Sequence, residues 1–167
     1  DNAQVGLIGG AGLWGMAISQ ISFSSLCDVV GMRNLLRLAL VGHIVGVLLF
    51  VFATGFSTLF AAALVVAIAN GMIEAVCNPL TATLYPDRKA GMLNRMHMWF
   101  PGGIVLGGLG CWALDQVHAD WRAKMIMVLI PALAYGLIFL REKFPPTEAA
   151  AAGQTLPDAF KAVATSP

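Results

Sequence analysis

Apolar residues gather in five stretches that short polar connections separate. The stretches cover about residues 5–26, 35–56, 59–84, 96–114 and 125–140. A helix that crosses the hydrocarbon core of a bilayer needs roughly 20 predominantly apolar residues. The first four stretches reach this length, whereas the fifth is short and depends on its flanking residues to span. The pattern therefore predicts an all-α, polytopic membrane helical bundle with about five transmembrane helices.

The composition also favours a membrane protein. Hydrophobic residues make up 58% of the chain and charged residues 11%, and the mean hydropathy is +0.77. Soluble domains carry about 25% charged residues, so the lipid bilayer is the expected partner of this chain. No basic run indicates a nucleic acid partner. The three cysteines show no metal-ligand spacing, and we expect neither a metal nor a cofactor.

The positions of lysine and arginine predict the orientation. With the N-terminus outside, the segments that face inward hold eight basic residues: Arg33, Arg37, Arg88, Lys89, Arg95, Arg141, Lys143 and Lys161. The outer connection holds Arg122 and Lys124. Because basic residues accumulate on the cytoplasmic side of a membrane, we expect the N-terminus of this chain to lie outside.

The organisation of the chain predicts a fragment of a larger protein. An odd number of spans that begins outside is unusual for a complete membrane protein, and the chain opens on Asp1. From Pro145 onward the sequence is rich in Ala, Pro and Thr. We expect residues 1–144 to form part of a helical bundle and residues 145–167 to form a cytoplasmic linker. A short amphipathic helix is predicted over residues 157–163.

The most informative polar residue is Glu74, near the middle of the third stretch. A carboxylate at this depth costs on the order of 3 kcal/mol on insertion scales, so it is usually kept where it faces a water-filled cavity or carries a proton. Asn70 and Asn78 lie four residues to either side, which places all three side chains on one face of a helix. This polar stripe is expected to face the interior of the bundle, where the amides suit solute hydroxyl groups.

Purely structural roles for these residues remain open. Glu74 can hydrogen-bond a neighbouring helix, and each asparagine can form an interhelical hydrogen bond instead of binding a solute. His43, alone in the second stretch, is typical of a packing histidine whose hydrogen bonds are satisfied. His118 lies in the outer connection, where no specific role is predicted.

Other classes of function fit the pattern less well. Water channels use two Asn-Pro elements, and only Asn78-Pro79 occurs here. An intramembrane enzyme needs a nucleophile or a metal-ligand constellation, which the serines and histidines do not form. A non-transporting scaffold or receptor is the main alternative to a transporter, although it has little use for a carboxylate between two amides at mid-span.

Glycine and proline predict how the helices pack and bend. Three Gly-x-x-x-Gly pairs offer flat helix surfaces for close packing: Gly6 and Gly10, Gly42 and Gly46, and Gly103 and Gly107. Three prolines lie within or near the ends of spans, where they can kink helices: Pro79, Pro101 and Pro131.

The first inner connection resembles a loop signature of the major facilitator superfamily. Asp28, Gly31 and Arg33 match that signature, whereas Ser24 and Val29 replace a glycine and a basic residue. At the inner end of a helix, Asp28 can pair with Arg33 or accept backbone hydrogen bonds from a neighbouring helix terminus. The resemblance implies a latch that holds the outward-open state, and the alternative is a simple turn at Gly31 with solvated charges.

A longer segment, residues 70–108, resembles the fucose–proton symporter branch of that superfamily, which includes bacterial fucose, glucose and galactose carriers. Glu74 and the Asn78-Pro79 pair match the most distinctive features of the branch. On this resemblance the five spans correspond to helices two to six of a twelve-helix carrier. The first helix, with its membrane-embedded aspartate, and the whole C-terminal half then lie outside this chain. The expected location is a bacterial inner membrane.

Asn94 and His97 belong to the same resemblance. The fucose carriers have a different polar residue at the position of His97, and a small residue is usual at the position of Pro101. The side chains of Asn94 and His97 are both expected at the inner start of the fourth stretch. There they line the lower part of a cavity, or His97 braces the loop instead.

The implied function is proton-coupled import of a sugar or a similar small polar solute by alternating access. Desolvation favours the neutral form of a carboxyl group and hydration favours the ionised form, so Glu74 is expected to carry the proton. The predicted solute-binding residues are Asn70, Glu74, Asn78, Asn94 and His97. A facilitator of another small solute, without proton coupling, is the alternative transporter.

Overall fold

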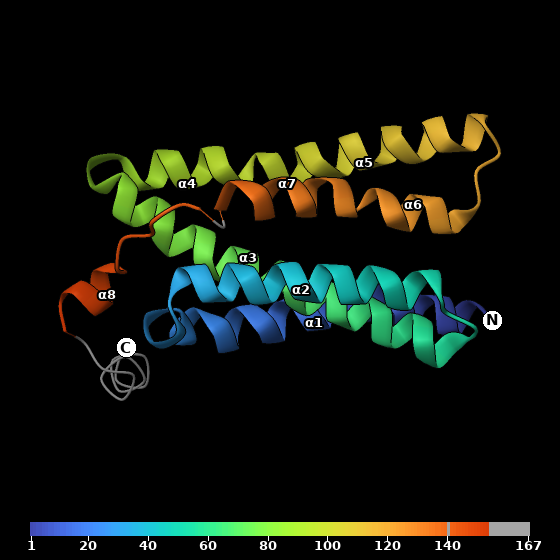
Figure 1. Cartoon of the computed structure of the whole chain (residues 1–167), viewed down its shortest axis with the longest axis horizontal. Helices are drawn as coiled ribbons and strands as arrows, with labels where there is room; N and C mark the ends of the chain where they lie inside the picture. The colour runs from blue at the N-terminus through green and yellow to red at the C-terminus, as the bar shows by residue number, and fades with distance from the viewer. Residues whose placement is uncertain (140, 154–167) are drawn as a thin grey trace.

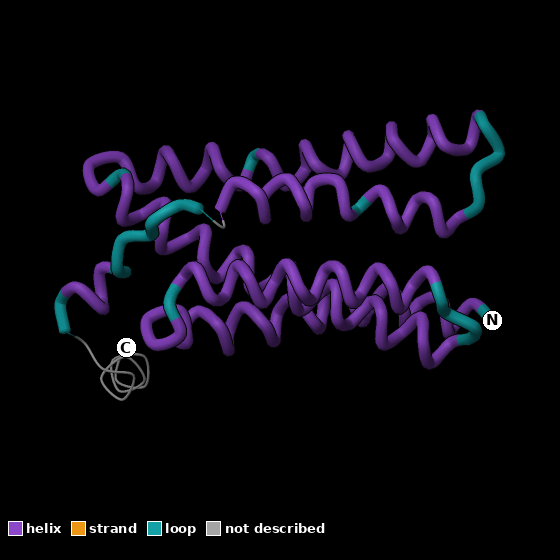
Figure 2. Tube along the Cα trace, viewed as in Figure 1, coloured by secondary structure: helices purple, strands orange, loops and turns teal. Residues whose placement is uncertain are grey.

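The computed structural model describes residues 1–139 and 141–153, and all regular elements in these ranges are helical (Figures 1 and 2). The all-α prediction is confirmed. The elements are α1 (Asn2–Val30), α2 (Met32–Val51), α3 (Phe56–Leu84), the 3₁₀ turn η1 (Pro86–Arg88), α4 (Lys89–His97), α5 (Trp99–Gln116), α6 (Trp121–Met127), α7 (Leu129–Phe139) and α8 (Glu148–Ala151). Leu140, Lys161 and the helix predicted over residues 157–163 lie outside the described residues.

The helices form two layers that α3 joins (Figure 1). α1, α2 and α3 pack together in one layer, where α3 lies against both α1 and α2. The run α4–α5 and the run α6–α7 form the other layer, and α2 contacts both α6 and α7. Because α3 reaches from one layer toward the other and then leads into α4, residues in its second half face both layers.

Gly31 alone separates α1 from α2. Its φ of +83° lies in the left-handed region, which glycine adopts without the steric cost of a Cβ atom. The Gly31 N–H donates to the Cys27 carbonyl at 3.1 Å and closes α1. The chain therefore turns within one residue, and the ends of the two helices stay close.

Two prolines break the helices of the second layer. α4 ends at His97, four residues before Pro101, and α6 ends at Met127, four residues before Pro131. A proline ring clashes with the carbonyl four residues earlier and provides no N–H to it. Each break is one residue long and is visible as a short loop inside an otherwise helical run (Figure 2).

Pro79 acts differently, since it lies inside α3, which continues to Leu84. The Thr83 hydroxyl donates to the Pro79 carbonyl at 2.8 Å. The buried Oδ1 atom of Asn78, the residue before this proline, has no hydrogen-bond partner among the described residues. The second half of α3 therefore holds a side-chain oxygen, Asn78 Oδ1, that has no partner among the described residues, and a proline that provides no N–H to the helix.

Small residues allow α3 to approach α1 and α2 closely. A Cβ atom added to Gly71 would lie 2.6 Å from the Ser19 Cβ and 2.7 Å from the Met16 carbonyl oxygen. Added to Gly42, it would lie 3.0 Å from the Ala69 Cβ, and added to Gly46 only 2.5 Å from a Val66 methyl carbon. The Gly42-x-x-x-Gly46 pair is a tight helix contact, as predicted.

The other two Gly-x-x-x-Gly pairs do not pack closely on the described residues. A Cβ atom at Gly6, Gly103 or Gly107 would meet nothing within 4 Å, and at Gly10 it would meet only the indole of Trp14 at 3.9 Å. Among the described residues these faces of α1 and α5 make no close helix contact, so the prediction of close packing is not met there.

Four helical segments are long and apolar enough to cross a membrane: Asn2–Val30, Met32–Val51, Phe56–Leu84 and Trp121–Phe139. The predicted span over residues 96–114 is helical except at Met98 but is not among the four. Its helix, α5, holds five glycines and ends with Asp115 and Gln116, which lower its mean hydropathy. The described residues therefore hold four candidate spans and one further helix, α5, that is not among them.

The connections alternate between two ends of the molecule (Figure 1). The α1–α2 turn, the α3–α4 connection and α8 lie at one end. The N-terminus, the α2–α3 connection and the α5–α6 connection lie at the opposite end. The prediction of orientation depends on this alternation, which brings the connections that are rich in arginine and lysine to the α8 end.

Candidate functional site

A cavity of about 290 Å³ lies where the second half of α3 meets α1, α4 and α5. We call it the Glu74 cavity. Its polar lining consists of Asn70 and Glu74, one helical turn apart on α3, and His97 at the end of α4. Its other lining residues are apolar or weakly polar: Met16, Ile73, Cys77, Met96 and Phe100. Three of the five residues predicted to bind a solute therefore line one cavity.

Glu74 and His97 face each other across this cavity. The Glu74 Oε1 atom lies 3.9 Å from the His97 Nδ1 atom. This separation is too long for a hydrogen bond, but it is within ion-pair range when the imidazole is protonated. The Glu74 side chain is 24% exposed, and its carboxyl group accepts no hydrogen bond from the residues that the structure describes. The carboxylate therefore lies in a mostly apolar cavity that also holds His97 and Cys77, and none of the described residues donates a hydrogen bond to it.

The break at Pro101 explains why His97 lies in the cavity. α4 ends at His97 and α5 begins at Trp99, and both His97 and Phe100, on either side of this break, line the cavity. The Thr81 hydroxyl, on α3, donates to the Met96 sulfur at 3.3 Å and ties α4 to α3 just beside the cavity. The proline that departs from the family pattern is thus part of what shapes this site.

Asn78 and Asn94 do not line the cavity with the other predicted residues. Asn78 is partly buried, and its Oδ1 atom has no hydrogen-bond partner among the described residues. Asn94 is exposed on α4, although it lies only three residues before His97. Their predicted contact with a solute stays a prediction.

Asn70 connects the cavity to a second polar group. The His43 Nε2 atom lies 2.9 Å from the Asn70 Oδ1 atom. The His43 Nδ1 atom lies 2.9 Å from the Ala39 carbonyl and 3.2 Å from the Tyr135 hydroxyl. His43 is 4% exposed and has its hydrogen bonds satisfied, as predicted. Tyr135 was not singled out from the sequence, where a tyrosine inside the apolar fifth stretch is the one available signal.

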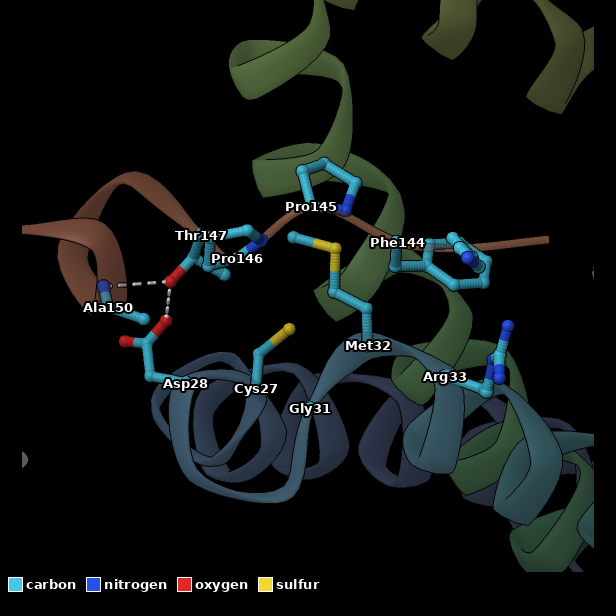
Figure 3. A pocket seen from close by; sticks show the side chains of 11 residues that line it. Cys27, Asp28, Gly31, Met32, Arg33, Phe144, Pro145, Pro146, Thr147 and Ala150 are labelled. Carbon is cyan, nitrogen blue, oxygen red and sulfur yellow. Dashed lines mark hydrogen bonds between the residues drawn. The ribbon is translucent and has the colours of Figure 1, made fainter.

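A second cavity lies at the end of the molecule that holds α8 (Figure 3). We call it the inner cavity. It has a volume of about 590 Å³, and the α1–α2 turn and the segment from Lys143 to Thr147 enclose it. Asp28, Gly31 and Arg33, the three residues of the predicted loop signature, all line it. The structure therefore brings the loop signature against the segment that follows the last apolar stretch.

Asp28 and Arg33 do not pair with each other in the described part of the chain. The Thr147 hydroxyl donates to Asp28 Oδ1, and the same hydroxyl accepts a hydrogen bond from the Ala150 N–H at 3.1 Å (Figure 3). The Arg33 guanidinium donates to the Glu142 carbonyl. Asp28 thus binds the side chain that caps α8, instead of Arg33 or a backbone N–H. Sequence reasoning could not find these partners, because they are more than 100 residues away.

An exposed ion pair adds a third link at the same end. The Lys89 Nζ atom lies 2.6 Å and 2.8 Å from the two carboxylate oxygens of Glu148. This pair joins the start of α4 to the first residue of α8. The Asp28, Arg33 and Lys89 contacts together fasten residues 142–150 to both inner connections of the bundle.

Comparison with known proteins now identifies the family. The family model of the Major Facilitator Superfamily matches residues 1–167. The chain belongs to the Major Facilitator Superfamily. This match confirms the superfamily that the loop signature predicts. With its apolar helices, this member of the superfamily is an integral membrane protein.

One curated relative of this superfamily member is the D-xylose-proton symporter-like 2 protein of Arabidopsis thaliana. It is 27% identical over 123 residues, which cover 73% of this chain and 24% of the relative. The chain therefore spans about a quarter of the relative's length. No solved structure matches the chain.

Proposed function

We propose that this chain is part of a secondary transporter that couples the movement of a proton to the uptake of a sugar or a similar small polar solute. The observation that carries the proposal is the Glu74 carboxyl group. It lies in a cavity at mid-helix, accepts no hydrogen bond from the described residues and faces a histidine at 3.9 Å. A carboxyl group at such a depth is expected to serve a proton or an ion pathway.

The charge state of Glu74 gives the cavity two states. When the cavity is hydrated, water and a protonated His97 stabilise the ionised carboxylate. When the cavity closes around a solute, desolvation favours the neutral carboxyl group. Proton binding is therefore linked to closure, and proton release is linked to opening. Alternating access of the two halves of a carrier around a central site then couples proton and solute movement.

The polar lining supports a hydroxylated solute. An amide and a carboxyl group one helical turn apart offer donors and acceptors to neighbouring hydroxyl groups, and the apolar remainder suits the faces of a sugar ring. The printed name of the Arabidopsis relative contains D-xylose and proton, which agrees with this class of solute. The cavity volume of about 290 Å³ lies near the lower end of small-molecule sites.

The orientation and the loop signature complete the proposal. We place the α8 end of the molecule in the cytoplasm, because that end holds most of the basic residues, and we place the N-terminus outside. The resemblance to bacterial carriers favours a bacterial inner membrane. In this orientation Asp28, Gly31 and Arg33 lie at the cytoplasmic end, where their contacts with residues 142–150 favour a closed inner side.

Transport by the carrier that contains this chain tests the proposal. Uptake of labelled xylose, fucose, glucose and galactose is measured in membrane vesicles with an imposed proton gradient. Accumulation of at least one sugar that a protonophore abolishes is the expected result. Uptake that stops at equilibrium with or without the gradient would identify a facilitator. The absence of any uptake for the four sugars would contradict the proposed class of solute.

A further inference from the structure

A chain of three side chains crosses from α7 to the Glu74 cavity. Tyr135 on α7, His43 on α2 and Asn70 on α3 lie within hydrogen-bond distance of one another in that order, with separations of 3.2 Å and 2.9 Å. His43 is 4% exposed, and its ring meets the Tyr135 ring edge to face at 6.0 Å. Asn70, at the end of the chain, is also part of the cavity lining.

For a neutral imidazole with the Asn70 carbonyl oxygen beside it, the hydrogen-bonding capacities of these groups give the direction of the chain. The Asn70 Oδ1 atom can only accept, so the His43 Nε2 atom must donate to it. A neutral imidazole that carries its proton on Nε2 has a lone pair on Nδ1. Of the two groups beside Nδ1, the Ala39 carbonyl cannot donate and the Tyr135 hydroxyl can. In this tautomer Tyr135 donates to His43 and His43 donates to Asn70, whereas the Ala39 carbonyl, 2.9 Å from Nδ1, is the acceptor for the other tautomer.

We propose that Tyr135 and His43 are positioning residues that fix the Asn70 amide with its NH₂ group toward the cavity. The inference rests on the proposed function, since it assigns Asn70 as a hydrogen-bond donor to a solute in the Glu74 cavity. With its carbonyl oxygen bound to His43, Asn70 presents only donors to that cavity. Glu74 then supplies the acceptor, so the two residues recognise a hydroxyl group by its oxygen and by its hydrogen.

The Ala39 carbonyl is the acceptor in the other tautomer of His43, in which the proton is on Nδ1. If Tyr135 provides no proton, the imidazole can donate from Nδ1 to Ala39, which lies 2.9 Å away. The lone pair is then on Nε2, and the amide must turn so that its NH₂ group donates to His43. Asn70 would present its carbonyl oxygen to the cavity, beside the carboxyl group of Glu74. The hydroxyl group on α7 thus selects which half of the amide the solute meets.

Kinetics of the carrier that contains this chain test the inference. Tyr135→Phe is expected to raise the KM for the transported sugar about 5- to 30-fold, with a small change in the maximal rate, because a misplaced donor weakens solute binding. His43→Leu is expected to do the same, and His43→Gln, whose amide can still donate to Asn70, is expected to restore part of the loss. Tyr85→Phe is the matched control, because in the described part of the chain Tyr85 forms no hydrogen bond with Tyr135, His43 or Asn70. The KM of this variant is expected to equal that of the wild type.

A double-mutant cycle separates this role from simple packing. In an Asn70→Ala background, Tyr135→Phe is expected to change the KM by less than about twofold, because the amide that it orients is gone. Equal effects of Tyr135→Phe in both backgrounds would overturn the inference. The same holds if the Asn70→Ala variant alone raises the KM while neither the Tyr135 nor the His43 variants do.

The tautomer of His43 provides a readout that does not depend on transport. Nitrogen-15 NMR of histidine-labelled carrier, with the His43 signal assigned by its loss in His43→Gln, is expected to show the proton on Nε2 in the wild type and on Nδ1 in Tyr135→Phe. One unchanged tautomer in both proteins would overturn the inference and leave the proposed function standing. If the tautomer switches but Glu74→Gln and Asn70→Ala leave sugar uptake unchanged, the proposed function fails, and with it the positioning role toward a solute.

Discussion

The two cavities of this molecule treat their charged groups in opposite ways. In the inner cavity, Asp28 accepts a hydrogen bond from Thr147, and Arg33 donates to the Glu142 carbonyl. In the Glu74 cavity, the carboxyl group accepts no hydrogen bond from the described residues, and the His97 imidazole lies 3.9 Å away. One carboxylate accepts a hydrogen bond from a distant segment, and the other accepts none from the described residues.

This difference distinguishes a contact that holds two segments together from a proposed proton-binding site. A carboxylate that accepts a fixed hydrogen bond is stabilised in its ionised form, so its charge changes little between states of the protein. A carboxylate with no fixed donor in an apolar cavity depends on water and on neighbouring charge, and small changes in the cavity change its protonation. The comparison supports the proposal that Glu74 carries the proton and that Asp28 holds residues 142–150, and four substitutions test this division.

The largest effect is expected for Glu74→Gln in the carrier that contains this chain. Glutamine keeps the size of the side chain and, with one acceptor and one donor group, resembles the protonated carboxyl group, but it cannot release a proton. The steady-state accumulation ratio of the sugar is therefore expected to fall to about one, while exchange of labelled for unlabelled sugar continues. Vesicle uptake with and without a proton gradient measures both quantities. Gradient-driven accumulation that persists in this variant would show that a residue other than Glu74 carries the proton.

A smaller effect is expected for His97→Gln. A protonated His97, 3.9 Å from Glu74, would contribute about 1 kcal/mol of support for the ionised carboxylate, so proton-driven uptake is expected to fall about fivefold when His97 is replaced. Initial rates at saturating sugar measure this change. His118→Gln, in the outer connection, is the control for loss of a histidine. An equal loss in both variants would show that His97 has no special relation to Glu74.

At the inner cavity, Thr147→Val is expected to loosen the linker. The substitution removes the hydroxyl that both binds Asp28 and caps α8, at a cost of about 1–2 kcal/mol. The rate at which a maleimide modifies Cys27, which is 2% exposed in the wall of this cavity, is expected to rise about 5- to 30-fold. Cys77 and Cys111 are replaced by serine for this measurement.

Thr147→Ser is the matched control, since serine keeps the hydroxyl and both hydrogen bonds. The rate of Cys27 modification in this variant is expected to match that of the wild type. Should the valine variant also protect Cys27 fully, the Asp28–Thr147 contact does not hold the linker against the α1–α2 turn.

The smallest effect is expected for Lys89→Ala. The Lys89–Glu148 pair is short, but its side chains are 41% and 53% exposed, and exposed pairs contribute about 0.2–1 kcal/mol, which salt reduces further. The rate of Cys27 modification is expected to rise less than about threefold at low salt and to equal that of the wild type at high salt. An increase as large as that of Thr147→Val would make the ion pair the main fastening of the linker.

The sequence predicts the helices well because apolar periodicity and length are local properties. It also predicts that Asn70, Glu74 and His97 serve one site, since a spacing of four residues and a nearby inner connection bring them together. The break at His97 has a local cause too, because a proline acts on the carbonyl four residues before it. The separation of Asn94 from the cavity, by contrast, depends on how α4 is rotated against α3, which no local pattern specifies.

The partners that give the two cavities their character come from distant positions. Asn70 meets a histidine 27 residues away and, through it, a tyrosine 92 residues from that histidine. Asp28 meets a threonine 119 residues away. Such contacts follow from the tight approach of α2 to α3 at Gly42 and Gly46 and from the path of the linker. These are properties of the packed bundle, and a single sequence does not reveal them.

The uptake of protons when sugar is added tests the central claim most directly. In lightly buffered, de-energised vesicles that hold the carrier, addition of a transported sugar is expected to make the medium more alkaline as protons enter with the sugar. The Glu74→Gln variant is expected to admit the sugar with no change in pH. Sugar entry into wild-type vesicles without alkalinisation, or alkalinisation that persists in the variant, would contradict the assignment of Glu74 as the proton carrier.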